Sequence, residues 1–206
     1  AWSRGLVQEA ADLGIIQGYA DGAFRPKASI TRGQVACFLV RALGSLIHEP
    51  GEYNNMNVYG NLTVNTPGVT LRNALITGNL YLTGGVGLGD LVLENVEVQG
   101  KIIIAGGGEA QGGENSIVLR NVRASVMEVD SMTDQFITLR AEGLTNIGDT
   151  NVRTQAYLED VTADGLGLKK ITFDAASGSR LDLAGNIKEF VNLTPESTIN
   201  LAQGII

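Results

Sequence analysis

Carboxylate side chains are densest between residues 130 and 164, and they are the first candidates for chemistry. A group of acids could hold calcium, and a neighbouring arginine could act as a base. The candidates are Asp130, Asp134, Asp149, Asp160 and Asp164, with Arg140 and Arg153 nearby in sequence. Two of them, Asp130 and Asp134, flank a Ser-Met-Thr turn, where carboxylates are usually solvated, and the five acids do not recur at one position of successive repeats. We therefore predict no catalytic residue and no metal site here.

The chain contains one histidine, His48, and one cysteine, Cys37. A nucleophile–histidine–acid triad would have to use His48, which lies in a predicted linker. Cys37 stands beside Phe38 on a predicted helix, so we expect a small buried side chain rather than a reactive thiol. A single cysteine also excludes an intrachain disulfide and disfavours a cysteine-based metal site. We predict a protein without enzymatic activity and without a cofactor.

Composition narrows the function classes further. The 206 residues include 27 glycines and only 5% aromatic residues, which favours many tight turns and few long helices. The formal charge of −7 argues against nucleic-acid binding, because tracking phosphates requires clustered lysine and arginine. No apolar run approaches the roughly 18 residues of a membrane span.

Charge and periodicity both change near residue 50. Residues 1–50 carry five basic and four acidic side chains, whereas residues 51–206 carry ten and eighteen. The first segment has helical spacing, and we predict one helix from Trp2 to Leu13. A second helix is predicted to begin at Thr31, which has capping-box spacing to Gln34, and to stop at Gly44.

Several short motifs keep fixed spacings across residues 1–44. They are Trp2, Leu13-Gly14-Ile15-Ile16-Gln17-Gly18-Tyr19, Asp21-Gly22-Ala23-Phe24-Arg25-Pro26, Ile30-Thr31-Arg32 and Leu39-Val40-Arg41-Ala42-Leu43. Together they resemble the S-layer homology (SLH) module. The module usually opens with a Phe-x-Asp-Val segment before its tryptophan, which this sequence does not contain, so we expect a module truncated at its start.

The resemblance implies a ligand and a set of contacts. Such modules usually act as three repeats and bind anionic, pyruvylated secondary polymers of the bacterial cell wall. Trp2 would stack on a sugar, Asp21 and Gly22 would contact the ligand from the loop, and Arg32 would pair with an anionic group. Gln34 stands where the family has glutamate. The alternative is that Asp21 and Arg32 only brace the loop against the second helix.

The rest of the chain alternates apolar and polar residues in short runs that repeat. An apolar-x-Leu-x-Asn-apolar motif recurs, and its leucine marks seven units at Leu71, Leu93, Leu119, Leu139, Leu158, Leu183 and Leu201. The steps of 18 to 26 residues are typical of a solenoid. We predict a parallel β-helix of about seven coils with Leu, Val and Ile stacked inside.

An asparagine position of the motif and a glycine-rich segment are interpreted separately. Asn73, Asn95, Asn121 and Asp160 occupy one position of the motif, and we interpret them as a turn ladder rather than a binding site. The glycine-rich segment 105–115 is expected to be a surface excursion, since no Lys-Ser/Thr follows it as in a phosphate loop.

The sequence therefore predicts a mixed fold: an SLH module at 1–45, a linker at 46–55 and an all-β solenoid at 56–206. Its apolar end, with Ile199, Leu201, Ile205 and Ile206, is expected to mediate self-assembly, because an open strand edge tends to pair. We expect a non-enzymatic structural protein of the bacterial cell surface that forms a homo-oligomer, a surface layer or an extracellular filament. The alternative, suggested by the fold of polysaccharide lyases, is a wall-anchored polysaccharide-binding or lyase-like enzyme.

Overall fold

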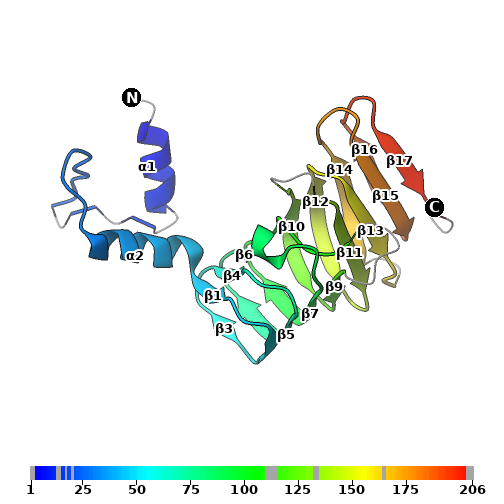
Figure 1. The fold of residues 1–206 in the computed structure, drawn as a ribbon, viewed down its shortest axis with the longest axis horizontal. Helices are drawn as coiled ribbons and strands as arrows, with labels where there is room; N and C mark the ends of the chain where they lie inside the picture. Colours follow the sequence, from blue (N-terminus) through cyan, green and yellow to red (C-terminus); the bar gives the residue numbers. More distant parts are fainter. Residues whose placement is uncertain are drawn as a thin grey trace.

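The computed structural model describes residues 3–12, 15–16, 18–19, 21–109, 116–131, 135–163 and 166–202. Two helices, α1 (Ser3–Asp12) and α2 (Arg32–Leu43), precede a parallel β-solenoid (Figure 1). In the described part of the chain, no helix combines the length and apolar character needed to cross a bilayer.

The strands follow one another with short connections and one 3-10 turn, η1 (Gly84–Val86). They are β1 (Ser45–Ile47), β2 (Gly51–Asn54), β3 (Asn57–Val58), β4 (Leu62–Val64), β5 (Val69–Ile76), β6 (Leu80–Leu82), β7 (Leu91–Val98), β8 (Lys101–Ile104), β9 (Ile117–Arg120), β10 (Arg123–Val129), β11 (Ile137–Glu142), β12 (Asn146–Val152), β13 (Ala156–Asp160), β14 (Gly167–Phe173), β15 (Arg180–Gly185), β16 (Glu189–Asn192) and β17 (Thr198–Leu201).

The solenoid strands pair in parallel with strands one turn away, which confirms the predicted β-helix. Side chains of one type therefore stack along the rod, as in the buried column Leu62, Leu80, Ile102 and Met127. Neighbouring turns lie about 4.8 Å apart, so each apolar side chain packs against its equivalents above and below. There are about six turns over residues 51–201, close to the seven coils predicted.

The segment predicted as a linker belongs to the solenoid instead. Strand β1 pairs with β4, and β2 pairs with β5, so residues 45–54 form the first coil. Ile47 is buried in the common core. The Pro50-Gly51 pair that suggested a linker makes a corner of that coil, because turn residues look alike in a solenoid corner and in a linker.

A column of asparagines runs along one corner, as predicted. Asn73 donates to Asn54 Oδ1 at 2.9 Å, Asn95 donates to Asn73 at 3.1 Å, and Asn121 donates to Asn95 at 2.8 Å. Asn73, Asn95 and Asn121 adopt positive φ of 51–57°, which bends the strands around the corner. Asparagine tolerates this left-handed conformation better than other non-glycine residues, so conformation and hydrogen bonding select the same residue.

The ladder gives a test of these two contributions. Asn95→Ala removes both ladder bonds of Asn95 and places a less tolerant residue at φ 55°. We expect a loss of about 2 kcal/mol in the free energy of unfolding, measured by urea denaturation. Asn95→Gly removes the same bonds but accepts the conformation, so it should cost about 1 kcal/mol less. Equal losses in the two variants would show that the backbone conformation contributes nothing.

Asp160 does not continue the asparagine column, contrary to the motif. Leu139 pairs with Ile117 instead of Leu119, so the register slips by two residues at β11. A slip of two keeps every side chain on its original face, because strand side chains alternate with period two. It moves Asp160 opposite Ala141, inside the core, where its side chain is fully buried.

The buried Asp160 carboxylate is satisfied by three donors. Oδ1 accepts from the backbone N–H of Thr162 at 3.0 Å and from its hydroxyl at 2.6 Å, and Oδ2 accepts from Leu168 N–H at 2.7 Å. Gly167 makes this possible, since a Cβ there would lie 1.9 Å from Oδ2. The group ties β13 to the start of β14.

Acidic and basic side chains alternate along an outer face and form a continuous ion-pair ladder. It runs through Glu52, Arg72, Glu94, Arg120, Glu142, Arg140 and Glu159. Its N···O distances range from 2.6 to 3.7 Å. Because the arginines are 39–46% exposed, each pair contributes less than about 1 kcal/mol, so the ladder mainly favours the correct register.

Helix α2 is joined to the solenoid without a spacer. Gly44 ends the helix by donating to Val40 O, and Ser45 then donates to Asn61 O in the next coil. Asn61 Nδ2 donates to Ala42 O at 3.1 Å, so a solenoid side chain satisfies a carbonyl at the end of α2. A Cβ at Gly44 would lie 1.8 Å from Asn61 O. Glycine is therefore required at this junction.

The glycine-rich segment is only partly the expected excursion. Gly106, Gly107 and Gly108 are buried, and the last two donate to Gly87 O and Gly89 O at 2.8 Å. A Cβ on Gly108 would lie 2.7 Å from Thr138 O. These glycines permit close packing of neighbouring coils. Residues 110–115 lie outside the described residues.

Candidate functional site in the N-terminal module

The loop and helix α2 form the candidate site. Thr31 is the N-cap of α2, and its hydroxyl accepts from Gln34 N–H at 3.2 Å. Gln34 Oε1 accepts from Thr31 N–H at 2.9 Å, which completes the predicted capping box. Gln34 therefore serves as the N3 partner in the capping box. Glutamate, the usual residue here in SLH modules, can serve in the same way.

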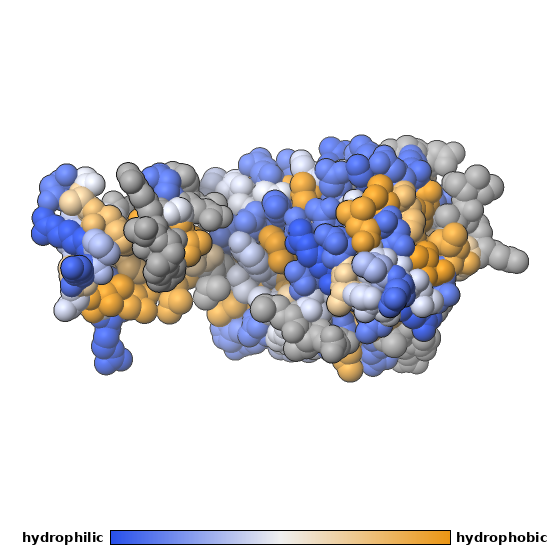
Figure 2. All heavy atoms as spheres, turned by 90° about the horizontal axis from the view of Figure 1, so that it is seen from above, coloured by the Kyte–Doolittle hydropathy of each residue, from blue (hydrophilic) through white to orange (hydrophobic). Residues whose placement is uncertain are grey.

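Apolar side chains gather on the surface of this module (Figure 2). Val40 of α2 is 66% exposed and Leu6 of α1 is 59% exposed. The other exposed large apolar residues here are Tyr19, Phe24, Ile30, Val35 and Leu39. Exposed apolar side chains gathered in this way often mark an interaction site. We call these seven residues the apolar face of the module.

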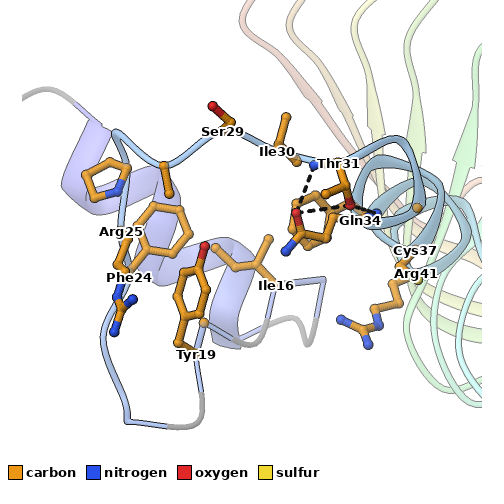
Figure 3. A pocket seen from close by; sticks show the side chains of 15 residues that line it. Ile16, Tyr19, Phe24, Arg25, Ser29, Ile30, Thr31, Gln34, Cys37 and Arg41 are labelled. Carbon is orange, nitrogen blue, oxygen red and sulfur yellow. Dashed lines mark hydrogen bonds between the residues drawn. The ribbon is translucent and has the colours of Figure 1, made fainter.

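A hollow of about 750 Å³ opens between the loop and α2. The rings of Tyr19 and Phe24 lie on its loop side, while Cys37 and Arg41 come from α2 (Figure 3). The Arg25 guanidinium lies over the Tyr19 ring, 4.6 Å from its centroid. Aromatic rings beside guanidinium groups can contact both the apolar faces of a sugar and an anionic substituent.

Asp21 braces the loop that borders the hollow. Its Oδ1 accepts from Ala23 N–H at 3.1 Å, and its Oδ2 pairs with Arg25 at 2.5 Å. The Ala23 hydrogen bond, followed by the Arg25 bond, holds the pKa of Asp21 below its ordinary value of 3.8. The bracing alternative is thus supported for Asp21, although its partner is Arg25 and not α2.

The order of these two causes is testable by titration. We expect NMR of the Asp21 carboxyl carbon to give a pKa below 3.8 in the intact chain. Because the folded pKa is lowered, the stabilisation from this loop is complete above 3.8 and is lost as pH falls through the folded value. Arg25→Gln should raise the pKa only part of the way, because the Ala23 bond remains. A full return to 3.8 would contradict this ranking.

Three of the four predicted ligand contacts lie among the described residues. Gly22 is exposed at positive φ in the loop, and Arg32 is exposed at the first position of α2. Neither of them, nor Asp21, lines the hollow. Arg32 has no ion pair with a described residue and remains available to an external anion. Trp2 lies outside the described residues.

Sequence reasoning missed Arg25, Tyr19 and Arg41 as wall residues of the hollow. The spacing of four residues between Asp21 and Arg25 could have indicated their ion pair. Cys37 was predicted to be buried but is exposed, on the α2 side of the hollow.

The acids singled out for chemistry do not form a centre among the described residues. No group of three or more potential metal ligands occurs in the described part of the chain. Asp160 is buried and engaged with Thr162 and Leu168, whereas Asp149 is exposed. Asp134 and Asp164 lie outside the described residues.

The far end of the solenoid carries the residues predicted for self-assembly. Strand β17 pairs with β15 on one edge, and no other described strand pairs with it. Ile199 packs partly buried against the core, and Leu201 is 61% exposed. Ile205 and Ile206 lie outside the described residues.

Comparison with known proteins supports the first module. Residues 1–36 match the family model described as the S-layer homology domain. No curated protein and no solved structure matches the chain significantly. SLH domains generally bind secondary cell-wall polymers, which indicates a bacterial protein associated with the cell surface or wall. The chain therefore carries an SLH domain of the S-layer homology family, joined directly to a parallel β-solenoid.

Proposed function

We propose that this chain is a non-enzymatic structural protein of the bacterial cell surface. In this proposal, the SLH domain anchors the molecule to wall polymer or docks it to neighbouring subunits. The solenoid acts as a rod that assembles into a surface layer or an extracellular filament. The observation that carries the proposal is the SLH match beside an exposed apolar face.

The contrast between the two modules supports a docking role for the first. The solenoid buries a continuous core, with Leu71, Leu93 and Leu119 fully buried. The apolar face of the SLH domain, by contrast, is exposed in a single chain. Burying such a face is favourable by about 25 cal/mol per Å², so it is expected to be covered in the assembled state.

The polar groups of the solenoid support a structural role. Its asparagines, arginines and glutamates are largely engaged in ladders between turns. Asp160, the most buried of the candidate acids that the structure describes, is saturated by protein donors. These groups stabilise the rod, so we place function in its surfaces and ends rather than in a reaction centre.

Wall anchoring is tested by cosedimentation of the full chain with purified secondary cell-wall polymer. We expect saturable binding that weakens about tenfold in Arg32→Gln, because one charge-assisted contact is lost. The matched control is Lys27→Gln, which removes the same charge from the same module at a residue that is not a predicted ligand contact. No binding by the unmodified chain, or equal loss in both variants, would exclude anchoring through Arg32.

A further inference from the structure

Most basic side chains of the solenoid are already paired. Of the ten lysines and arginines in residues 51–206, seven form ion pairs with described residues. The other three are Arg123, Lys169 and Lys188, all exposed and with no ion pair to a described residue. Two of these three, Arg123 and Lys169, line the same hollow. An even distribution of basic residues over the acidic rod does not explain why they lie together.

That hollow, here called the corner cleft, has a volume of about 550 Å³. It lies where successive coils turn, and its polar lining comprises Glu97, Gln99, Arg123, Ser125, Asn146 and Lys169. The hollow is open to solvent over much of its extent. A second hollow of about 290 Å³ shares Glu97 and Arg123 with it.

Strand register brings the lining residues of the corner cleft together. Asn146 faces Arg123 across paired strands, with Glu97 opposite Arg123 on the other side. Gly148 forms part of the lining, and a Cβ at that position would lie 2.5 Å from Ser125 O. The cleft is therefore set by the strand register and is already formed in the free chain.

The uncharged groups of the cleft are also available. Gln99, Ser125 and Asn146 make no side-chain hydrogen bond to any residue that the structure describes, unlike the ladder residues Asn95 and Asn121. Amides and a hydroxyl beside a guanidinium and an ammonium match a ligand with several hydroxyls and an anionic group. A sugar acid has this chemistry.

The charge balance selects a carboxylate over a phosphate. Arg123 and Lys169 contribute two positive charges, and Glu97 contributes one negative charge. The net charge of +1 balances one carboxylate, whereas a phosphate monoester carries about −1.5 to −2 at neutral pH. Glu97 can also accept hydrogen bonds from sugar hydroxyls.

We propose that the corner cleft of the solenoid binds a carboxylated polysaccharide through Arg123 and Lys169. This site lies outside the SLH domain and does not depend on the function proposed for that domain. It gives the rod a second glycan contact, whose ligand is a uronic-acid polymer.

The experiment uses the full chain, isothermal titration calorimetry and three probes. They are a galacturonic-acid tetramer, its methyl ester and inorganic phosphate. We expect the free acid to bind, and the neutral ester and phosphate to bind at least tenfold more weakly. Binding of the ester as tight as that of the acid, tighter binding of phosphate, or no binding of the acid would overturn the proposal.

Variants locate the site. Arg123→Gln and Lys169→Gln should each weaken acid binding about tenfold. The control Lys170→Gln removes the same charge one residue away, where the lysine pairs with Glu189 at 3.2 Å, and should change it less than about twofold. If Lys169→Gln and Lys170→Gln weakened acid binding equally, binding would depend on the overall charge and not on the cleft, which would contradict the proposal.

Glu97→Gln tests the charge argument. It raises the net charge of the cleft and should strengthen phosphate binding relative to the unmodified chain, narrowing the preference for carboxylate. If the preference for carboxylate over phosphate were unchanged in Glu97→Gln, Glu97 would not be the cause of that preference. None of these variants alters residues 1–44, so cosedimentation with wall polymer, measured in parallel, reports on the SLH domain separately.

Discussion

Replacing Asp160 with alanine is expected to lower the free energy of unfolding by about 3 kcal/mol or more. The substitution leaves three buried donors without an acceptor: the N–H and hydroxyl of Thr162, and the N–H of Leu168. An unsatisfied buried donor costs about 1–3 kcal/mol, and the fully buried site gives water little access. Relief of the buried charge offsets part of this loss.

Urea denaturation followed by circular dichroism measures the effect. Asp149→Ala is the matched control, because Asp149 is exposed and has no ion pair with a described residue. It should change stability by less than about 0.5 kcal/mol. If both variants were equally stable, Asp160 would have no structural role, and its burial would need another explanation.

Introducing a negative charge at the end of the solenoid is expected to abolish self-assembly. In Leu201→Glu, a carboxylate replaces a side chain that is 61% exposed on the last described strand. An end-to-end contact would then have to bury an unpaired charge, which costs several kcal/mol. We expect polymers of the unmodified chain in negative-stain electron microscopy, and dispersed particles of the variant.

Two further variants keep this test decisive. Ile199→Glu addresses the same strand, but Ile199 packs against the core, so its fold must be checked by circular dichroism. Leu144→Glu is the matched control, because Leu144 is 57% exposed and precedes β12, away from β17. Polymers that persist in Leu201→Glu, or that disappear equally in Leu144→Glu, would rule out assembly through this end.

The N-terminal module was largely predictable because its signals are local. The Thr31–Gln34 capping box and the Gly44 stop act within a few residues, so spacing alone located α2. The apolar residues of α2 follow a helical pattern in the sequence, but that pattern did not indicate their exposure, as Cys37 of the same helix illustrates. Whether a helix face is covered depends on a partner element, and local spacing carries no information about the partner.

In the solenoid, too, the sequence predicted some features and not others. The asparagine column at Asn73, Asn95 and Asn121 followed from the motif, since each residue bends its own corner and bonds its equivalent. The position of Asp160 did not follow, because a two-residue slip at β11 leaves the alternation of faces unchanged. A period-two pattern cannot distinguish registers that differ by two.

By itself, the sequence determined the helices of the SLH domain, the repeat length and the residue types that fill the core. These depend on spacing along the chain. Tertiary structure alone decided that residues 45–54 form the first coil, that Asp160 is buried, and that Arg123 and Lys169 line one cleft. Each depends on which residues of different coils become neighbours, and strand register between turns sets that.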